Sequence, residues 1–214
     1  MREPCIPVRK VVRRSPVRVV GYHASMKMGA LIPWESQIER DFFKWMEVDP
    51  EVTAFFSQPR RFSFGSVTYT PDAYIETPDG SFYVEVKDDE ALFDVEQMNK
   101  LKFVSSHLMS QGIDFRIALS SVIREIELIK NVSILNRHVR RKVVLSASDL
   151  SEVQKIKNYA HQYLIDDFLA GIAQGAISAD LRQGSEFENW LVSPTIGGNN
   201  YGAREILPKS EIYI

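Results

Sequence analysis

The clearest apolar stripe in the first half of the chain has helical spacing. Four apolar residues recur three or four positions apart, or side by side: Ile38, Phe42, Trp45 and Met46. Side chains at this spacing share one face of an α-helix, and Asp49-Pro50 is a sequence at which helices end. The pattern predicts a helix over residues 35–48.

Strand-like alternation of apolar and polar residues follows this helix. It predicts three strands, over residues 61–67, 69–76 and 81–87. The last two are separated by Pro78-Asp79-Gly80, which is a strong turn sequence. We therefore expect these two strands to pair as a hairpin.

The next segment returns to helical spacing. A second helix is expected over residues 90–110, with Gly112 as its C-terminal stop and an apolar stripe made of Val95, Met98, Leu101, Val104 and Leu108. A short buried strand over residues 115–119 and a third helix over residues 123–135 follow. The order helix, three strands, helix, strand, helix indicates an α/β (α+β) fold, in which helices flank a mixed sheet.

The last third of the chain reads as a separate small unit. Residues 136–142 are basic and resemble a linker or a last edge element, and Ser146-Ala147-Ser148-Asp149 is typical of a helix cap. Its apolar positions can fill a core or dock a partner, and we favour a core: Val153, Ile156, Tyr159, Tyr163, Leu164, Phe168 and Leu169. The expected division is a basic arm (1–30), a main domain (31–144) and a small, mostly helical C-terminal domain (145–214).

Composition narrows the class of protein. The chain has 214 residues, of which 44% are apolar and 25% charged, which is ordinary for a globular protein. No apolar stretch approaches the ~18 residues of a membrane span, and the basic N-terminus lacks the apolar run of a signal peptide. The single cysteine, Cys5, excludes an intramolecular disulfide framework and a cysteine-based zinc site. We therefore expect a cytoplasmic protein.

Basic residues are unevenly distributed, although the net charge is only −2. No acidic residue lies between Glu3 and Glu35, whereas six basic residues do: Arg9, Lys10, Arg13, Arg14, Arg18 and Lys27. A second basic group contains Arg137, Arg140, Arg141 and Lys142. Such blocks are often only solvated arms, but they can also contact the phosphates of DNA. Both groups are candidate DNA-binding residues.

The segment over residues 69–87 contains the candidate chemistry. Side chains alternate along a strand, so Glu85 and Lys87 lie on one face and the apolar Phe82 and Val84 on the other. If the preceding strand pairs across the predicted turn, Asp72 approaches Glu85 and Lys87 from its neighbour. Two carboxylates and an ammonium then converge at one point.

Hydrolysis of a phosphodiester needs such a set. Carboxylates such as Asp72 and Glu85 can hold Mg²⁺, which polarises the phosphate and lowers the pKa of a bound water. Lys87 can orient that water and stabilise charge on the phosphoryl oxygens. A lone Glu-x-Lys on a strand is usually a solvated surface, but the combination of Pro-Asp, a short hairpin and Glu-x-Lys is typical of PD-(D/E)xK nucleases.

A further carboxylate is expected from the first helix, where four candidates occur: Glu35, Glu39, Asp41 and Glu47. Ser36 and Glu39 also fit a capping box, in which Glu39 would reach back to the Ser36 backbone N–H. Glu35 and Glu39 lie on one helix face. Spacing alone does not choose between them.

Several separated motifs resemble TnsA, the endonuclease subunit of heteromeric transposases. They are Gly21-Tyr22-His23-Ala24-Ser25-Met26-Lys27, Glu35-Ser36-Gln37-Ile38-Glu39-Arg40-Asp41-Phe42, Asp49-Pro50-Glu51-Val52, Gln58-Pro59, Tyr69-Thr70-Pro71-Asp72 and Val84-Glu85-Val86-Lys87. The likeness covers residues from about 15 to 135.

The resemblance implies roles that spacing does not give. It selects Glu39 as the helix carboxylate, beside Asp72, Glu85 and Lys87, with Glu39, Asp72 and Glu85 as ligands of Mg²⁺, or Mn²⁺ as a substitute. Some relatives have glutamine at the position of Glu85. It also implies a bacterial enzyme that nicks the 5′ strands at transposon ends. The implied partners are double-stranded DNA, a DDE transposase (TnsB-like) and an ATPase regulator (TnsC-like), the last contacted by a winged-helix C-terminal domain.

Two other readings remain open. One is a PD-(D/E)xK restriction or repair nuclease that acts without a partner. The other is a catalytically silent DNA-binding or scaffold subunit, against which the intact cluster of Asp72, Glu85 and Lys87 argues. A zinc enzyme is disfavoured because the four histidines are scattered along the chain: His23, His107, His138 and His161.

Overall fold

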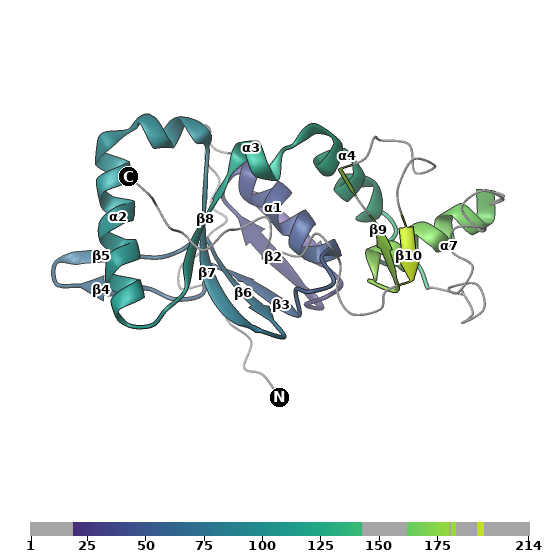
Figure 1. Cartoon of the computed structure of the whole chain (residues 1–214), viewed down its shortest axis with the longest axis horizontal. Helices are drawn as coiled ribbons and strands as arrows, with labels where there is room; N and C mark the ends of the chain where they lie inside the picture. The colour runs from purple at the N-terminus through teal and green to yellow at the C-terminus, as the bar shows by residue number, and fades with distance from the viewer. Residues whose placement is uncertain (1–18, 143–161, 180, 183–191, 195–214) are drawn as a thin grey trace.

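The computed structural model describes residues 19–142, 162–179, 181–182 and 192–194 (Figure 1). Five basic residues of the predicted arm lie outside this part of the chain: Arg9, Lys10, Arg13, Arg14 and Arg18. The predicted cap at residues 146–149 and the C-terminal tail also lie outside it. Within the described residues, no helix is both long and apolar enough to cross a membrane.

A four-stranded mixed sheet forms the centre of the fold. Its strands are arranged in the order β3 (Ala54–Ser57), β6 (Ala73–Thr77), β7 (Gly80–Lys87) and β8 (Phe115–Leu119). β6 is antiparallel to both β3 and β7, whereas β7 is parallel to β8. The predicted α/β fold with a mixed sheet is thus confirmed, and so is the hairpin across residues 78–80.

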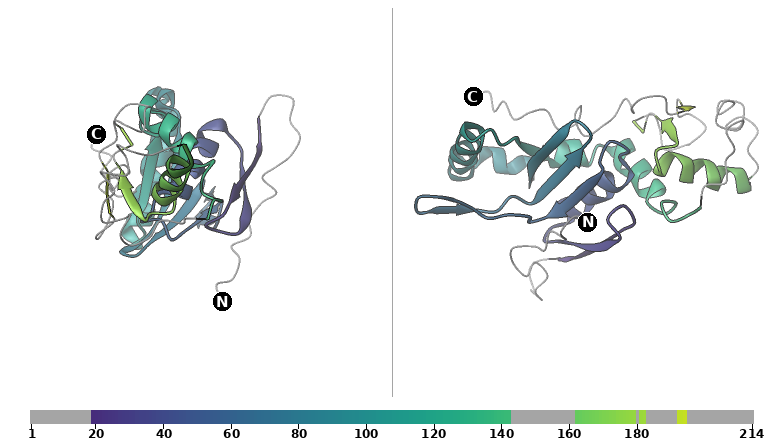
Figure 2. Two further views of the ribbon diagram at one scale, coloured as in Figure 1. Left: turned by 90° about the vertical axis from the view of Figure 1, so that its right-hand side faces the viewer. Right: turned by 90° about the horizontal axis from the view of Figure 1, so that it is seen from below.

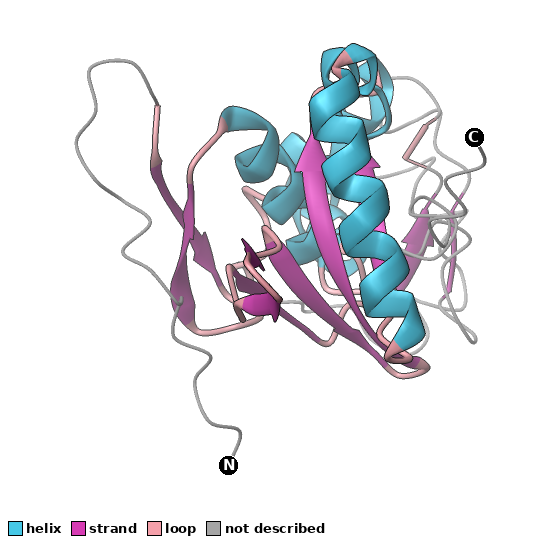
Figure 3. Cartoon of the chain, turned by 90° about the vertical axis from the view of Figure 1, so that its left-hand side faces the viewer, coloured by secondary structure: helices cyan, strands magenta, loops and turns pink. Residues whose placement is uncertain are grey.

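Helices cover both faces of this sheet, as Figures 1 and 3 show. α1 (Gln37–Val48) and α4 (Ile126–Leu135) pack on the face that carries Phe82, Val84 and Val86 of β7, in one large apolar cluster. α2 (Val95–Ser110) packs on the other face in a smaller cluster. The buried members of this smaller cluster are Phe62, Tyr69, Leu101, Val104, Leu108 and Phe115.

Two predicted helices are interrupted. The segment expected as a helix over residues 90–110 begins with a 3₁₀ turn, η1 (Asp89–Phe93), and α2 starts only after Asp94, whose carboxylate accepts from the N–H groups of Glu96 and Gln97. Val95, expected in the apolar stripe, is 74% exposed because it lies in this first turn. The third predicted helix is divided into α3 (Ser120–Ile123) and α4.

Two hairpins and one strand differ from expectation. β4 (Phe62–Phe64) and β5 (Val67–Tyr69) pair with each other, and the strand expected over residues 69–76 breaks at Pro71, which has no N–H to donate to a ladder. β3 was not predicted. β1 (Gly21–Ser25) and β2 (Ala30–Trp34) form a further hairpin, so the part of the predicted arm from residue 21 onward is folded.

The described C-terminal residues pack against the main domain. α7 (Gln162–Ala173) and β9 (Ile177–Ala179), which pairs with β10 (Val192–Pro194), lie at the opposite end of the molecule from the β4–β5 hairpin (Figures 1 and 2). Phe168 and Leu169, predicted to be core residues, are buried in the same large cluster as α1 and α4. The predicted boundary at residue 144 therefore separates segments that share one core.

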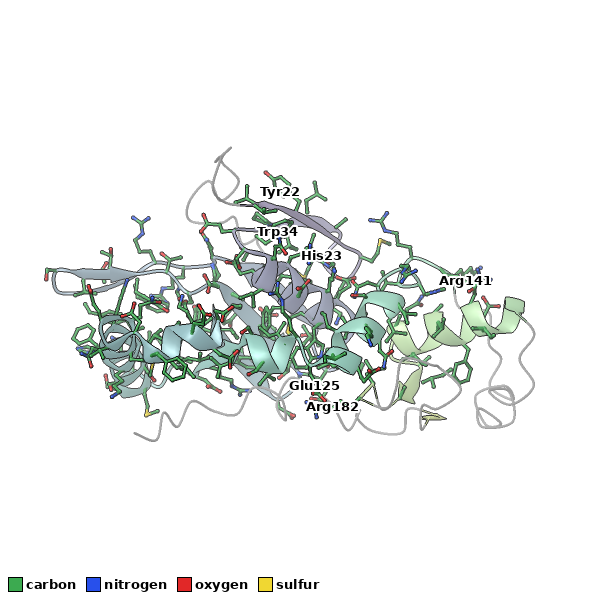
Figure 4. The ribbon with its side chains drawn as sticks, turned by 90° about the horizontal axis from the view of Figure 1, so that it is seen from above. Tyr22, His23, Trp34, Glu125, Arg141 and Arg182 are labelled. Carbon is green, nitrogen blue, oxygen red and sulfur yellow. The ribbon has the colours of Figure 1, made fainter. Side chains whose placement is uncertain are left out.

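Polar contacts reinforce this packing. The Asn131 side chain donates to the Leu181 carbonyl at 2.8 Å. Arg182 Nε donates to Glu125 Oε2 at 2.8 Å, and these two side chains are labelled in Figure 4. Arg141 Nε lies 2.7 Å from Asp167 Oδ1, and its NH1 lies 3.1 Å from Asp166 Oδ2. The basic stretch at residues 136–142 thus follows α4 and joins it to α7.

A buried carboxylate, Glu47, fastens the β1–β2 turn to the end of α1. Its Oε2 accepts from Ser25 Oγ at 2.5 Å, and its Oε1 accepts from the backbone N–H groups of Met26 and Lys27 at 2.9 and 3.0 Å. His23 Nε2 lies 3.5 Å from the same carboxylate. Burial alone would raise the pKa of Glu47, but these contacts outweigh it and lower the pKa to about 2.

We expect Glu47→Gln to lower the free energy of unfolding by about 3 kcal/mol at pH 7, since each unit of pKa shift corresponds to about 1.4 kcal/mol. The carboxylate contributes fully above its ordinary pKa of 4.5, and this contribution is lost as the pH falls towards about 2. Urea unfolding at pH 7 and pH 3 should show the difference between wild type and variant shrinking. The exposed Glu96→Gln is the control, and a difference that does not change with pH would contradict the role of the charge.

Candidate active site

The register of β6 and β7 brings Asp72 to Glu85. Ala73 lies opposite Val84, so the residue before β6 lies beside the next residue of β7. The Asp72 carbonyl accepts from Gln58 N at 2.8 Å, and its Oδ2 accepts from Val86 N at 2.9 Å. Both the backbone and the carboxylate of Asp72 are therefore held in place.

Glu85 and Lys87 lie on the same face of β7, as the alternation predicts. Lys87 Nζ lies 2.6 Å from Glu85 Oε1. Burial alone would lower the pKa of Lys87, but the charges of Glu85 and Asp72 outweigh it and raise the pKa. Lys87 is therefore a charged donor at neutral pH, which fits orientation of a water or of a phosphoryl oxygen.

Tyr69 belongs to this site, although the sequence analysis assigned it no role. Its hydroxyl lies against Glu85, and both burial and the Glu85 charge raise its pKa, so it is a neutral phenol. Tyr69 Oη and Glu85 Oε2 are both buried. Buried polar atoms nearly always have partners, and the Tyr69 hydroxyl and the Glu85 carboxylate are the partners of each other here, so Tyr69 helps to hold Glu85 in the site.

Glu39 reaches the same region from the first turn of α1. Its backbone N–H donates to Ser36 Oγ at 3.1 Å, and its Oε2 accepts from Glu35 N at 2.8 Å, one residue earlier than the capping box predicts. Burial, then the charges of Glu35 and Glu85, raise the pKa of Glu39. Burial and the charges of Glu85 and Glu39 likewise raise the pKa of Asp72. The three carboxylates thus lie close enough to repel one another.

The other two acidic candidates of α1, Asp41 and Glu47, have partners outside the cleft. Asp41 is buried and pairs with Arg40 at 2.8 Å and with Arg124 at 3.0 Å, which joins α1 to the end of α3. Glu47 fastens the β1–β2 turn. Of the four candidates, Glu35 and Glu39 line the cleft that contains Asp72.

This cleft has a volume of about 1250 Å³. Its walls come from the first turn of α1, the end of β7, the β4–β5 hairpin and the start of α2. Asp72, Glu85 and Lys87 all line it, so a substrate in the cleft would meet the whole cluster.

The donor set fits a hard divalent cation. Mg²⁺ prefers oxygen ligands and often binds through one or two carboxylates, with waters and substrate phosphates in its other positions. Asp72 and Glu85 supply two such carboxylates, and both line the cleft. No group of three or more acidic, histidine or cysteine side chains in the described residues is arranged around one metal position. The fit therefore rests on two carboxylates, with Glu39 beside them.

The predicted DNA-binding residues that the structure describes differ in their contacts and exposure. Lys27 Nζ donates to the carbonyls of Met46 and Asp49 at 2.7 and 2.5 Å, so it caps the C-terminal end of α1; burial lowers its pKa to about 8. We therefore leave Lys27 out of the DNA-binding set. Arg141 pairs with α7, and Arg140 is exposed.

Two cations outside the predicted DNA-binding set, Arg61 and Lys100, line the cleft itself. Arg61 has only Arg60 beside it and Lys100 has only Lys102 close by, so neither lies in a long basic run. Only the fold brings them to the carboxylates.

Comparison with protein families adds an independent finding. Residues 37–120 match the family described as TnsA-like endonuclease N terminal, a stretch that runs from α1 to the end of β8 and contains Glu39, Asp72, Glu85 and Lys87. Comparison with curated proteins gave no match. With its mixed sheet flanked by helices and its carboxylate–lysine cluster, the stretch over residues 37–120 is similar to the N-terminal domain of TnsA-like endonucleases.

Proposed function

We propose that the protein is a metal-dependent DNA endonuclease that nicks the 5′ strands at transposon ends. The observation that carries this proposal is the convergence of Asp72, Glu85 and Lys87 in one cleft, within a domain that matches TnsA-like endonucleases. Its partners in cut-and-paste transposition would be a DDE transposase, which processes the 3′ ends, and an ATPase regulator.

The carboxylates and the lysine of the cluster have different roles in the proposed reaction. Asp72 and Glu85 would hold Mg²⁺, with Glu39 as a further carboxylate beside them. When bound, the metal polarises the scissile phosphate and lowers the pKa of a water molecule. Lys87, held by Glu85, donates to that water or to a non-bridging phosphate oxygen and stabilises the charge that develops on it.

The β-sheet fixes this arrangement before substrate binds. Asp72 is held by two backbone hydrogen bonds, and Glu85 and Lys87 lie on the central strand β7. Groups on rigid elements need little rearrangement when charge develops, which is the main source of electrostatic catalysis.

Metal binding provides a direct test. We expect Mn²⁺ to bind between Asp72 and Glu85 at roughly 2.0–2.2 Å, and to be seen as an anomalous peak in soaked crystals. Asp72→Asn should abolish this binding in calorimetry, because it removes a charged ligand while its oxygen can still accept from Val86 N. Asp79→Asn, in the exposed hairpin turn, is the control. Absence of manganese from these carboxylates would count against the proposal.

A further inference from the structure

We propose that Arg61 and Lys100 form a phosphate-binding edge of the cleft, along which the DNA backbone is held next to the catalytic cluster. This inference rests on the proposed nuclease function and deepens it. It places DNA contacts on the β4–β5 hairpin and α2, and not only on the basic stretches of the sequence.

The two cations are placed by a well-packed unit. Arg61 immediately precedes β4, and Lys100 lies in the first half of α2. The small apolar cluster joins these elements, because Phe62 next to Arg61 and Leu101 next to Lys100 are both buried in it. The charged side chains are therefore exposed on a fixed base.

Their charges are available to a ligand. Arg61 and Lys100 are both exposed, and no ion pair with a carboxylate involves either of them among the described residues. Lys100 Nζ lies 5.7 Å from the centre of the Tyr69 ring, a cation–π distance that keeps the ammonium beside the site without neutralising it. Lys87, the other cation among the described residues that line the cleft, pairs with Glu85.

Two acidic residues that line the cleft, Asp94 and Asp88, cap helices. Asp94 accepts from the N–H groups of Glu96 and Gln97 and so caps α2, and Asp88 accepts from Glu90 N and caps η1. Thr68 and Thr70 also line the cleft beside the two cations. Basic side chains with neighbouring hydroxyls are the usual contacts of a DNA backbone, and they position the duplex without reading its sequence.

The occupant that fits is a DNA phosphate backbone. A strand cut at Asp72, Glu85 and Lys87 must bring one phosphate to that cluster, and the neighbouring phosphates then extend along the walls of the same cleft. Cations on the hairpin and α2 can neutralise those phosphates and release their counterions. This contact would select no sequence, which agrees with a nuclease that takes its target from partners.

The test compares two double variants of the full chain. Arg61→Gln with Lys100→Gln removes the proposed contacts. Arg60→Gln with Lys102→Gln removes two neighbouring cations that do not line the cleft. Binding to a short labelled duplex is measured by fluorescence anisotropy over a series of salt concentrations, and thermal melting confirms that both variants are folded.

We expect the first variant to bind roughly tenfold more weakly, because it loses two phosphate contacts while the other contacts with the duplex remain. Its salt dependence should flatten by about two units of slope, one for each lost phosphate contact. The control variant should bind like wild type. Strand cleavage with the transposase present should fall in parallel for the first variant only.

The outcomes separate the two proposals. If wild type binds and cuts DNA but both variants behave like it, Arg61 and Lys100 do not contact phosphate, and the nuclease function stands. If both variants lose affinity equally, the effect is one of overall charge, and the inference is again wrong. If wild type neither binds DNA nor cuts it with its partners, the proposed function fails and the inference falls with it.

Discussion

Replacing Lys87 by alanine should reduce strand cleavage by about a hundredfold to a thousandfold, which is the scale of losing a donor to developing oxyanion charge. Lys87→Arg should fail as well, because a planar guanidinium cannot take the place of a compact ammonium beside Glu85 and a bound water. Cleavage of 5′ strands at transposon ends, with the transposase present, is the measurement. Metal binding by Asp72 and Glu85 should persist.

Stability must be measured alongside this cleavage. An exposed strand lysine would contribute little, but Lys87 is only 26% exposed and pairs with the buried Glu85. Removing one partner of a buried pair leaves the other charge uncompensated, so we expect some loss of thermal stability, smaller with metal bound. Lys102→Ala on α2 is a control outside the cleft. Cleavage at the wild-type rate by Lys87→Ala would show that the assigned role is wrong.

The second large effect concerns the partners. We expect the purified chain to make little or no specific cleavage and to cut 5′ strands at transposon ends once the DDE transposase is added. A nuclease that acts alone must read base edges or DNA shape. The net charge of −2 and the sequence-independent cations of the cleft offer no such reader in the described residues.

A comparison of cleavage products with and without the transposase checks this expectation. Efficient, site-specific double-strand cutting by the isolated protein would favour the reading as an autonomous restriction or repair nuclease. No cutting under either condition, with metal bound and the protein folded, would favour a silent scaffold.

The response of the protein to an ATPase regulator has to be tested with the full chain. Ending the chain after residue 144 would remove Phe168, Leu169 and Ile172 from the large apolar cluster. Loss of buried side chains of this size costs about 2–5 kcal/mol each, so such a truncation would fail for reasons of folding. Substitutions on the surface of the C-terminal segment, which leave the apolar cluster intact, would test the response to the regulator.

The sequence predicts the centre of the site well because the relevant signals are local. Alternation along one strand places Glu85 beside Lys87, and a three-residue turn is enough to bring Asp72 to them. The choice among the acidic residues of α1 is different. Asp41 pairs with Arg124 and Glu47 accepts from Ser25, and both of these partners come from distant parts of the chain.

The cations of the cleft escape prediction for a related reason. A run of basic residues draws attention in a sequence, yet Lys27 turns out to cap a helix. Arg61 and Lys100 lie in no long basic run and come together only because the β4–β5 hairpin packs on α2. The β1–β2 hairpin was not predicted either, and Glu47, which accepts from its turn, lies about 20 residues further along the chain.

The two apolar clusters on opposite faces of the sheet are unequal in size, and cooperative units of a protein often follow such divisions. The smaller cluster joins the β4–β5 hairpin to α2 through six buried residues, whereas the larger one extends over α1, α4 and α7. The hairpin and α2 can therefore exchange their amide hydrogens in local openings that leave the rest of the sheet protected. Such openings would widen one wall of the cleft while Asp72, bound to the backbone of β7, stays in place.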